Sequence, residues 1–180
     1  MKDEDSSSPD LHPGHHTIRL KGFDYTQLGF YFVTICTHQQ KCVFGKVERS
    51  VVTLNRLGEL VQNCWHQIPI HFTHTKTHEF VVMPNHIHGI VEICCQLGRS
   101  SAAPLQTKDR PLVAPGSLGA IIRSFKSAAA WRAHIEHSFD GNLWQRNYYE
   151  KALLTAKQLA DAQAYILQNP KRWAQREMSV

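Results

Sequence analysis

Residues 81–93 are VVMPNHIHGIVEI, an apolar run interrupted by a Pro-Asn pair and by two histidines. Apolar residues on both sides of this turn signal predict an antiparallel hairpin, with strands over His78–Met83 and His86–Cys94. Successive side chains of a strand point to opposite faces, so His86 and His88 share one face. Two neighbouring imidazoles form half of a divalent metal site, although by itself such a pair favours a structural role.

Two strands and two helices flank this hairpin along the chain. Phe30–Thr37 is rich in aromatic and β-branched residues and is apolar on both faces, which predicts a central buried strand. Apolar residues at helical spacing predict an amphipathic helix over 53–67, ended by Pro69, and another that starts at the capping residue Ser117. A last strand is predicted over Tyr148–Leu154.

The order of these elements is strand, helix, strand, strand, helix, strand, which is the βαββαβ pattern of a ferredoxin-like α+β fold. Its antiparallel sheet would carry both amphipathic helices on one face and leave the other face free for a ligand. A shorter strand or hairpin arm is predicted over 42–52, with a turn near Gly45. Residues 97–115 contain prolines and small residues without periodicity, which predicts a long surface loop.

An appended C-terminal helix is predicted to begin at Thr155, which opens a capping box, and to stop before Pro170. Ile166 lies on its buried stripe. Tyr165 lies on a polar flank, and Asn169 follows one turn later on the same face. Packing does not require a tyrosine there, but an amphipathic tyrosine that covers the helix edge is an equal alternative.

The composition predicts one folded domain over 17–175, preceded by a disordered tail over 1–16. The net charge of +5 fits a nucleic-acid partner, although many proteins without such a partner are equally basic. Five cysteines without a C-x-x-C pair argue against a disulfide framework or a zinc ribbon. We expect a cytoplasmic protein, because the sequence has neither a membrane-spanning apolar run nor a signal peptide.

Several blocks of sequence resemble a known superfamily. Residues 83–89 (MPNHIHG) resemble the metal-binding motif of the HUH endonucleases, and residues 165–170 (YILQNP) resemble their single-tyrosine helix. Three further blocks are similar to those of the REP-associated tyrosine transposases, relatives of the insertion-sequence single-tyrosine transposases: GFYFVTICT at 29–37, GSLGAIIRSFK at 116–126 and WQRNYYE at 144–150. The chain departs from the family at Lys151, where relatives often carry histidine, so no auxiliary histidine is expected there.

The resemblance implies a metal-dependent DNA transposase, in which His86, His88 and the side-chain oxygen of Asn169 hold one Mg²⁺ or Mn²⁺ ion. It implies that Tyr165 attacks a phosphodiester of single-stranded DNA, which gives a 5′-phosphotyrosyl intermediate and a free 3′-hydroxyl. The implied substrate class is repetitive palindromic DNA folded as hairpins. The basic side chains that either contact phosphate or face solvent are Arg19, Lys21, Arg123, Lys126, Arg146 and Lys171.

Two other functions can be weighed against this one. A nucleotide-hydrolysing fold with three alternating histidines is excluded, because Ile90 stands where the third histidine would be. A domesticated relative that binds DNA hairpins without cutting them is the alternative, and the intact set of His86, His88, Tyr165 and Asn169 argues against it. The sequence leaves the choice between monomer and homodimer open, so the tyrosine helix could serve its own sheet or a partner's.

Overall fold

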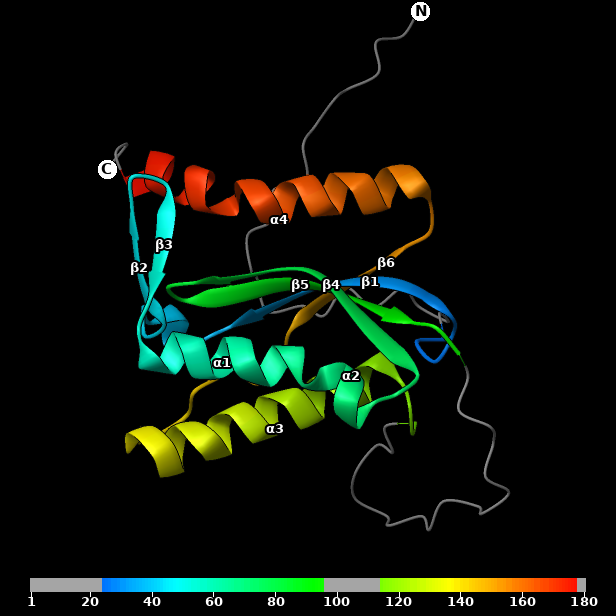
Figure 1. Cartoon of the computed structure of the whole chain (residues 1–180), viewed down its shortest axis with the longest axis horizontal. Helices are drawn as coiled ribbons and strands as arrows, with labels where there is room; N and C mark the ends of the chain where they lie inside the picture. The colour runs from blue at the N-terminus through cyan, green and yellow to red at the C-terminus, as the bar shows by residue number, and fades with distance from the viewer. Residues whose placement is uncertain (1–23, 96–113, 178–180) are drawn as a thin grey trace, which may run out of the picture.

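The computed structural model describes residues 24–95 and 114–177. The predicted tail over 1–16, together with Arg19 and Lys21, lies outside these residues, as does all but the last two residues of the loop predicted over 97–115. In the described part, the order of elements is the predicted α+β pattern with one short hairpin inserted after the first strand (Figure 1).

Four antiparallel strands form the main sheet, in the order β4-β5-β1-β6. Their bounds are Gly29–Cys36 for β1, Thr75–Met83 for β4, His86–Ile93 for β5 and Tyr149–Leu153 for β6. β1 lies between β5 and β6, which confirms the prediction of a central buried strand. The predicted hairpin is β4–β5, and it turns at residues 84–85 as expected, with Met83 paired to His86.

Helices cover both faces of this sheet (Figure 1). As predicted for the amphipathic pair, one face carries α1 (Arg56–His66) and α3 (Leu118–His137), with the short α2 (Ile68–His71) beside them. The opposite face carries α4 (Ala156–Glu177), so the expectation that this face is free for a ligand is wrong. The physical reason is apolar surface: Ile166 of α4 is buried against Phe32, Ile90 and Leu153 of the sheet.

The starts of three helices follow the capping rules. Asn55 caps α1 and its side chain accepts from the backbone N–H of Gly58 at 3.0 Å, so the helix starts after the predicted residue 53, which belongs to a strand. Ser117 caps α3 as predicted. The capping box of α4 also forms: Thr155 Oγ1 accepts from the N–H of Gln158 at 3.1 Å, and the Gln158 side chain accepts from the preceding backbone at 2.7 Å.

The inserted hairpin turns at a different place from the one predicted. Its strands are β2 (Gly45–Glu48) and β3 (Val51–Leu54), and the chain turns at Arg49 and Ser50, which both have positive φ. Gly45 begins β2 instead. A Cβ there would lie 2.2 Å from the carbonyl oxygen of Thr53, so close approach of the two backbones explains this glycine.

The two prolines differ in their effect. α1 ends at His66, one residue from the end predicted before Pro69, whereas α4 does not stop at Pro170. Pro69 lies in the first turn of α2, where its missing N–H leaves no hydrogen bond unmade. Pro170 lies inside α4, where it deprives the carbonyl of Ile166 of a helical donor. The helix continues because residues beyond the proline pack on the sheet side: the Trp173 ring lies 5.9 Å from the ring of His86. Tertiary contact therefore overrides the local stop signal.

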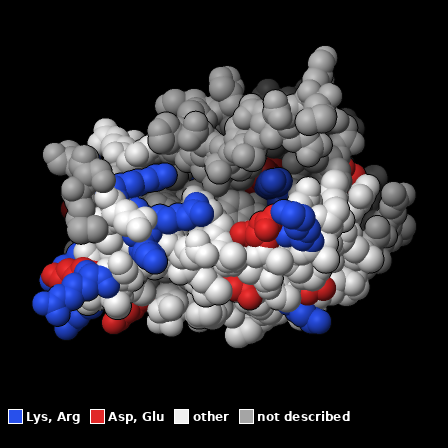
Figure 2. Space-filling view, turned by 90° about the horizontal axis from the view of Figure 1, so that it is seen from above, with Lys and Arg blue, Asp and Glu red and all other residues white. Residues whose placement is uncertain are grey.

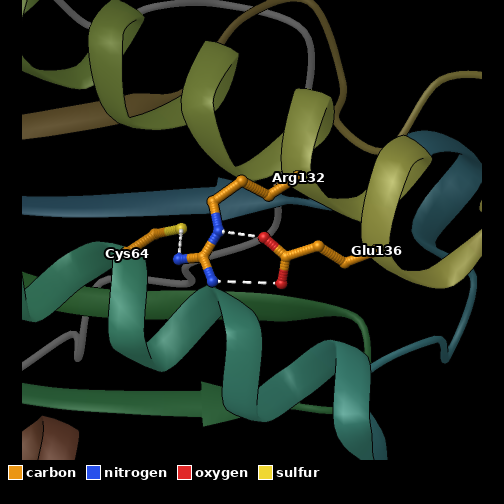
Figure 3. A network of polar contacts seen from close by, with 3 residues as sticks. All are labelled: Cys64, Arg132 and Glu136. Carbon is orange, nitrogen blue, oxygen red and sulfur yellow. Dashed lines mark hydrogen bonds and ion pairs between the residues drawn. The ribbon is translucent and has the colours of Figure 1, made fainter.

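A polar contact joins the two long helices of the first layer (Figure 3). Arg132 on α3 bonds both carboxylate oxygens of Glu136 one turn later, and its Nη1 lies 3.6 Å from Sγ of Cys64 on α1. The carboxylate thus holds the guanidinium in one orientation across the helix pair. Because the Glu136 carboxylate is open to solvent, the contact fixes geometry more than it stabilises the fold.

We predict that Gly89→Ala destabilises the protein by about 1–3 kcal/mol, because overpacked cores lose roughly that much. Trp65 and Phe80 stack at 4.6 Å over Gly89 of β5, and an added Cβ would lie 2.3 Å from Cζ2 of Trp65. Urea unfolding measures the loss. The double variant Gly89→Ala with Trp65→Leu should lose less free energy of unfolding than the sum of the losses of the two single variants. Ser127→Ala, at an exposed position, is the neutral control. An unchanged midpoint for Gly89→Ala would contradict this packing.

Candidate active site

The two histidines of β5 lie side by side on the face covered by α4. Their ring centroids are 4.6 Å apart, whereas Ile87 between them is fully buried in the core on the opposite face. His86 pairs with Cys36 and His88 with Thr34 on the central strand. The alternation predicted from the sequence is therefore present, on a strand that is hydrogen-bonded to a neighbour on both sides.

One nitrogen of each imidazole is held by a neighbouring polar group. His86 Nδ1 lies 2.6 Å from Oδ1 of Asn85, which accepts its proton, and His88 Nδ1 lies 2.8 Å from Oγ1 of Thr34. Such partners set the tautomer and the orientation of a metal-binding histidine. They leave Nε2 of both rings as the atoms that can ligate an ion.

Burial keeps both imidazoles neutral. It lowers the pKa of His86 to about 4; a hydrogen bond that the ring makes to the Asn169 side chain acts in the opposite direction, and the charge of Arg176 lowers the pKa further. Burial likewise lowers the pKa of His88 well below its ordinary value, and His86 adds to this effect. Only neutral imidazole offers a lone pair to a metal, so at neutral pH both rings are in the ligating form.

The helix α4 brings Tyr165 and Asn169 to these histidines. The half-buried Tyr165 ring lies 5.2 Å from the His88 ring and 5.9 Å from Phe32, edge-on to both. Asn169 is buried, and its side chain hydrogen-bonds His86. Residues four apart lie on one helix face, so the tyrosine and the amide approach the strand as one rigid piece. The structure thus brings together all four residues singled out in the sequence.

Two further residues reach the site from beyond Pro170, where the sequence predicted that the helix stops. Arg172 lies over the face of the Tyr165 ring, with Cζ 5.0 Å from the ring centroid, and Trp173 packs beside His86. They follow Tyr165 by seven and eight residues, which is two helical turns. Extending the helical spacing through the proline would have identified both.

The donor set could hold a divalent ion. Two neutral imidazoles and one amide oxygen are nitrogen and oxygen donors that would leave coordination positions for oxygens of a substrate. Residues 24–95 and 114–177 contain no group of three or more His, Cys, Asp or Glu that could hold a metal. A third ligand for the two histidines would therefore come from another type of residue, and in this set it is the amide of Asn169.

Comparison with known proteins places the chain in a family and in a fold. No protein-family model matches it. An uncharacterized protein of Haemophilus influenzae is 40% identical over 172 residues, which span 92% of this chain and 94% of that protein. The chain belongs to the same family as this Haemophilus protein. The solved structure of a REP-associated tyrosine transposase bound to a REP hairpin matches with a TM-score of 0.54 and 18% identity, over 83% of this chain and 71% of that one.

This chain has the fold of a REP-associated tyrosine transposase. A second structure, of a candidate transposase from Deinococcus radiodurans, is 16% identical over 81% of this chain and 93% of that one, with a TM-score of 0.47. None of the helices in the described residues is long and apolar enough to span a bilayer.

Within this transposase fold, the predicted DNA-contacting side chains lie in different places. Lys171 is exposed on α4, close to the site. Arg146 is also exposed, and it lies at the histidine end of the sheet, because the N–H of the preceding Gln145 donates to the last carbonyl of β1. Arg123 is exposed on α3, which lies across the sheet from α4, so the structure does not bring it to the histidines. Arg19 and Lys21 lie outside the described residues.

A basic surface lies where the last turns of α4 approach the β2–β3 hairpin. Figure 2 shows Lys and Arg gathered at this end of the molecule. We call this surface the basic ridge, and its exposed members are Arg49, Lys171, Arg172 and Arg176, together with Lys46, which is paired with Glu48 at 2.7 Å. Since the ridge includes Arg172, which touches Tyr165, positive charge continues from the surface to the edge of the site.

Lys126, by contrast, uses its ammonium group inside the protein. Nζ donates to the carbonyl oxygens of Gln145 at 2.7 Å and Arg146 at 3.1 Å, and burial lowers its pKa to about 8. This lysine ties α3 to the segment that leads into β6. A contact with phosphate would require these hydrogen bonds to break.

We predict that stability rises with pH between about 8 and 10 because of Lys126. The folded-state pKa of about 8 is below the ordinary 10.5, so in this window the unfolded chain binds the extra proton. Urea unfolding across the window should show a rise in wild type relative to Lys126→Met, a comparison that cancels the titration of cysteines and tyrosines. Parallel curves for the two proteins would show that burial of this ammonium costs nothing.

Proposed function

We propose that the protein is a transposase-like, metal-dependent endonuclease and strand transferase that acts on single-stranded DNA at repetitive palindromic hairpins. The observation that carries this proposal is the juxtaposition of Tyr165 and Asn169 with His86 and His88, which are about eighty residues away in the sequence. The REP hairpin bound to the transposase of similar fold supports the choice of DNA substrate. The basic ridge beside the tyrosine supplies charge for a phosphate backbone.

The proposed chemistry starts with the phenol. Tyr165 Oη loses its proton to solvent and attacks phosphorus, the bond to the 3′-oxygen breaks, and that oxygen takes up a proton. The products are a 5′-phosphotyrosyl bond and a free 3′-hydroxyl. Attack of a 3′-hydroxyl on the phosphotyrosine reverses the sequence, so rejoining needs no nucleotide cofactor.

Three groups of the chain assist this reaction in our proposal. His86, His88 and Asn169 would hold one Mg²⁺ or Mn²⁺ ion, which would supply Lewis-acid polarisation of the phosphate. Arg172 places its guanidinium over the face of the Tyr165 ring, with Cζ 5.0 Å from the ring centroid, and this contact helps to hold the ring in place. The edge contacts of the Tyr165 ring with Phe32 and His88 hold it in one orientation before substrate binds.

We predict that wild-type protein incubated with hairpin DNA bearing single-stranded flanks and Mn²⁺ forms a covalent adduct, seen as a band of reduced mobility in a denaturing gel. Tyr165→Phe should form none, because it lacks the attacking oxygen. Tyr149→Phe is the matched control: this tyrosine also lies edge-on to Phe32, at 6.3 Å, and its loss should leave the adduct. If Tyr149→Phe removes the adduct while Tyr165→Phe keeps it, the nucleophile is misassigned. Hairpin binding without any adduct would establish the non-cleaving alternative.

We predict that Asn169→Ala and His86→Ala each weaken Mn²⁺ binding by at least about tenfold. Loss of a residue that only supports a metal ligand already weakens metal binding by about tenfold or more, and loss of a ligand should cost at least as much. Electron paramagnetic resonance of free Mn²⁺ measures the affinity without any DNA. His78→Ala is the control, since this half-buried histidine of the same sheet pairs with Glu92 at 2.8 Å and should not matter. Chelation of the metal should abolish adduct formation. Equal Mn²⁺ affinity in wild type and His86→Ala would refute this ligand set.

A further inference from the structure

A cavity of about 340 Å³ opens at the histidine end of the sheet, outside the site described above. Two segments line it: residues 37–43, which follow β1 and contain the short helix η1 (His38–Gln40), and residues 139–143, which follow α3. The half-buried ring of Phe139 forms one wall, and the exposed side chains of Gln39, Lys41, Asp140 and Asn142 stand at the rim. The volume is at the small end of ligand pockets, which measure roughly 300–1,000 Å³.

The backbone around this cavity is strained. Gln39 and Gln40 have φ of 56° and 54°, and Ser138 has φ of 50°, a left-handed conformation that costs a non-glycine residue roughly 1–2 kcal/mol. Gly141 in the cavity wall has φ of 92°. The surrounding structure holds this strain, as the backbone N–H of His38 donates to the carbonyl of Leu143 at 2.9 Å and ties the two segments together. Strain of this kind collects at binding sites.

The cavity shares a wall with the turn that carries the metal-site histidine. The backbone N–H of Thr37 donates to the carbonyl of Asn85 at 2.9 Å, and the N–H of Val43 donates to Pro84 at 2.9 Å. The side chain of the same Asn85 holds His86 Nδ1 at 2.6 Å. One residue of the turn therefore contacts the cavity wall on one side and orients the candidate metal ligand on the other.

The chemistry of the walls suits a nucleobase. An aromatic ring offers a stacking surface to any base, the amides of Gln39 and Asn142 can each donate to and accept from a base edge, and Lys41 can meet a phosphate. We propose that this cavity binds one unpaired base of the DNA strand beside the phosphate that Tyr165 attacks. This inference rests on the proposed function, and it adds a site that selects the position of cleavage along the strand.

The test is a double-mutant cycle that combines a substitution in the protein with an abasic nucleotide in the DNA. The full-length chain carrying Tyr165→Phe, which cannot cleave, is titrated with a labelled stem-loop oligonucleotide bearing single-stranded flanks. A single abasic nucleotide is moved along the flanks, and binding is followed by fluorescence anisotropy. At one flank position the abasic nucleotide should weaken binding on the order of tenfold, as expected for loss of one stacked base. Adding Phe139→Ala should weaken binding to the intact oligonucleotide by a similar factor and make binding indifferent to the abasic nucleotide at that position.

Two further variants serve as controls. Phe139 packs against the core, so the stability of Phe139→Ala is checked by thermal unfolding. Asn142 is exposed, and Asn142→Ala should reduce the preference for one base at the same position. The matched aromatic control is Trp131→Ala, an exposed tryptophan of α3 that should change nothing. Equal losses for intact and abasic DNA in Phe139→Ala, or no sensitive flank position, would overturn the cavity proposal. Failure of wild type to form the covalent adduct would overturn the proposed cleavage alone, because the binding cycle needs no reaction.

Discussion

Burial of Ile166 against the second face of the sheet is the contact on which the candidate site depends. Phe32, Ile90 and Leu153 present an apolar surface there, and covering such a side chain contributes roughly 1.5–3 kcal/mol. Tyr165 precedes Ile166 and Asn169 follows three residues later, so a helix seated through Ile166 leaves neither of them free to lie elsewhere. A packing contact without any chemistry of its own therefore brings Tyr165, Asn169 and the two histidines together within one chain.

The same burial sets the electrostatics of the site. Removing water from His86 and His88 favours their neutral forms, and Thr34 and Asn85 compensate by satisfying one nitrogen of each ring. The cations of α4 remain at the surface, where the basic ridge meets solvent. Neutral ligands inside and positive charge outside are what a site needs if it is to bind a divalent ion and a polyanion together.

The two faces of the sheet divide the work between them. The face under α1 and α3 holds the larger core, in which Trp65 stacks on Phe80, and the face under α4 holds the histidines. Residues 84–85 connect the cavity to the histidines at one end of the sheet. Their carbonyls accept hydrogen bonds from the segment after β1, which lines the cavity, and the Asn85 side chain orients His86. The proposed base-binding cavity and the proposed cleavage site can thus be held by one turn.

The sequence by itself determined the elements and their faces. Local patterns of neighbouring residues predict the elements: the alternation in β5, the apolar spacing in α1 and α3, and the caps at Ser117 and Thr155. Only the tertiary structure decided how far α4 runs past Pro170, that Lys126 is turned inward, and that the second sheet face is covered in the same chain. Each of these depends on partners distant in sequence: the His86 ring for Trp173, two carbonyls for Lys126, and the apolar patch of the sheet for Ile166. A proline's local penalty or a lysine's solvation is outweighed only when such partners lie in contact, and contact between distant residues is a property of the fold.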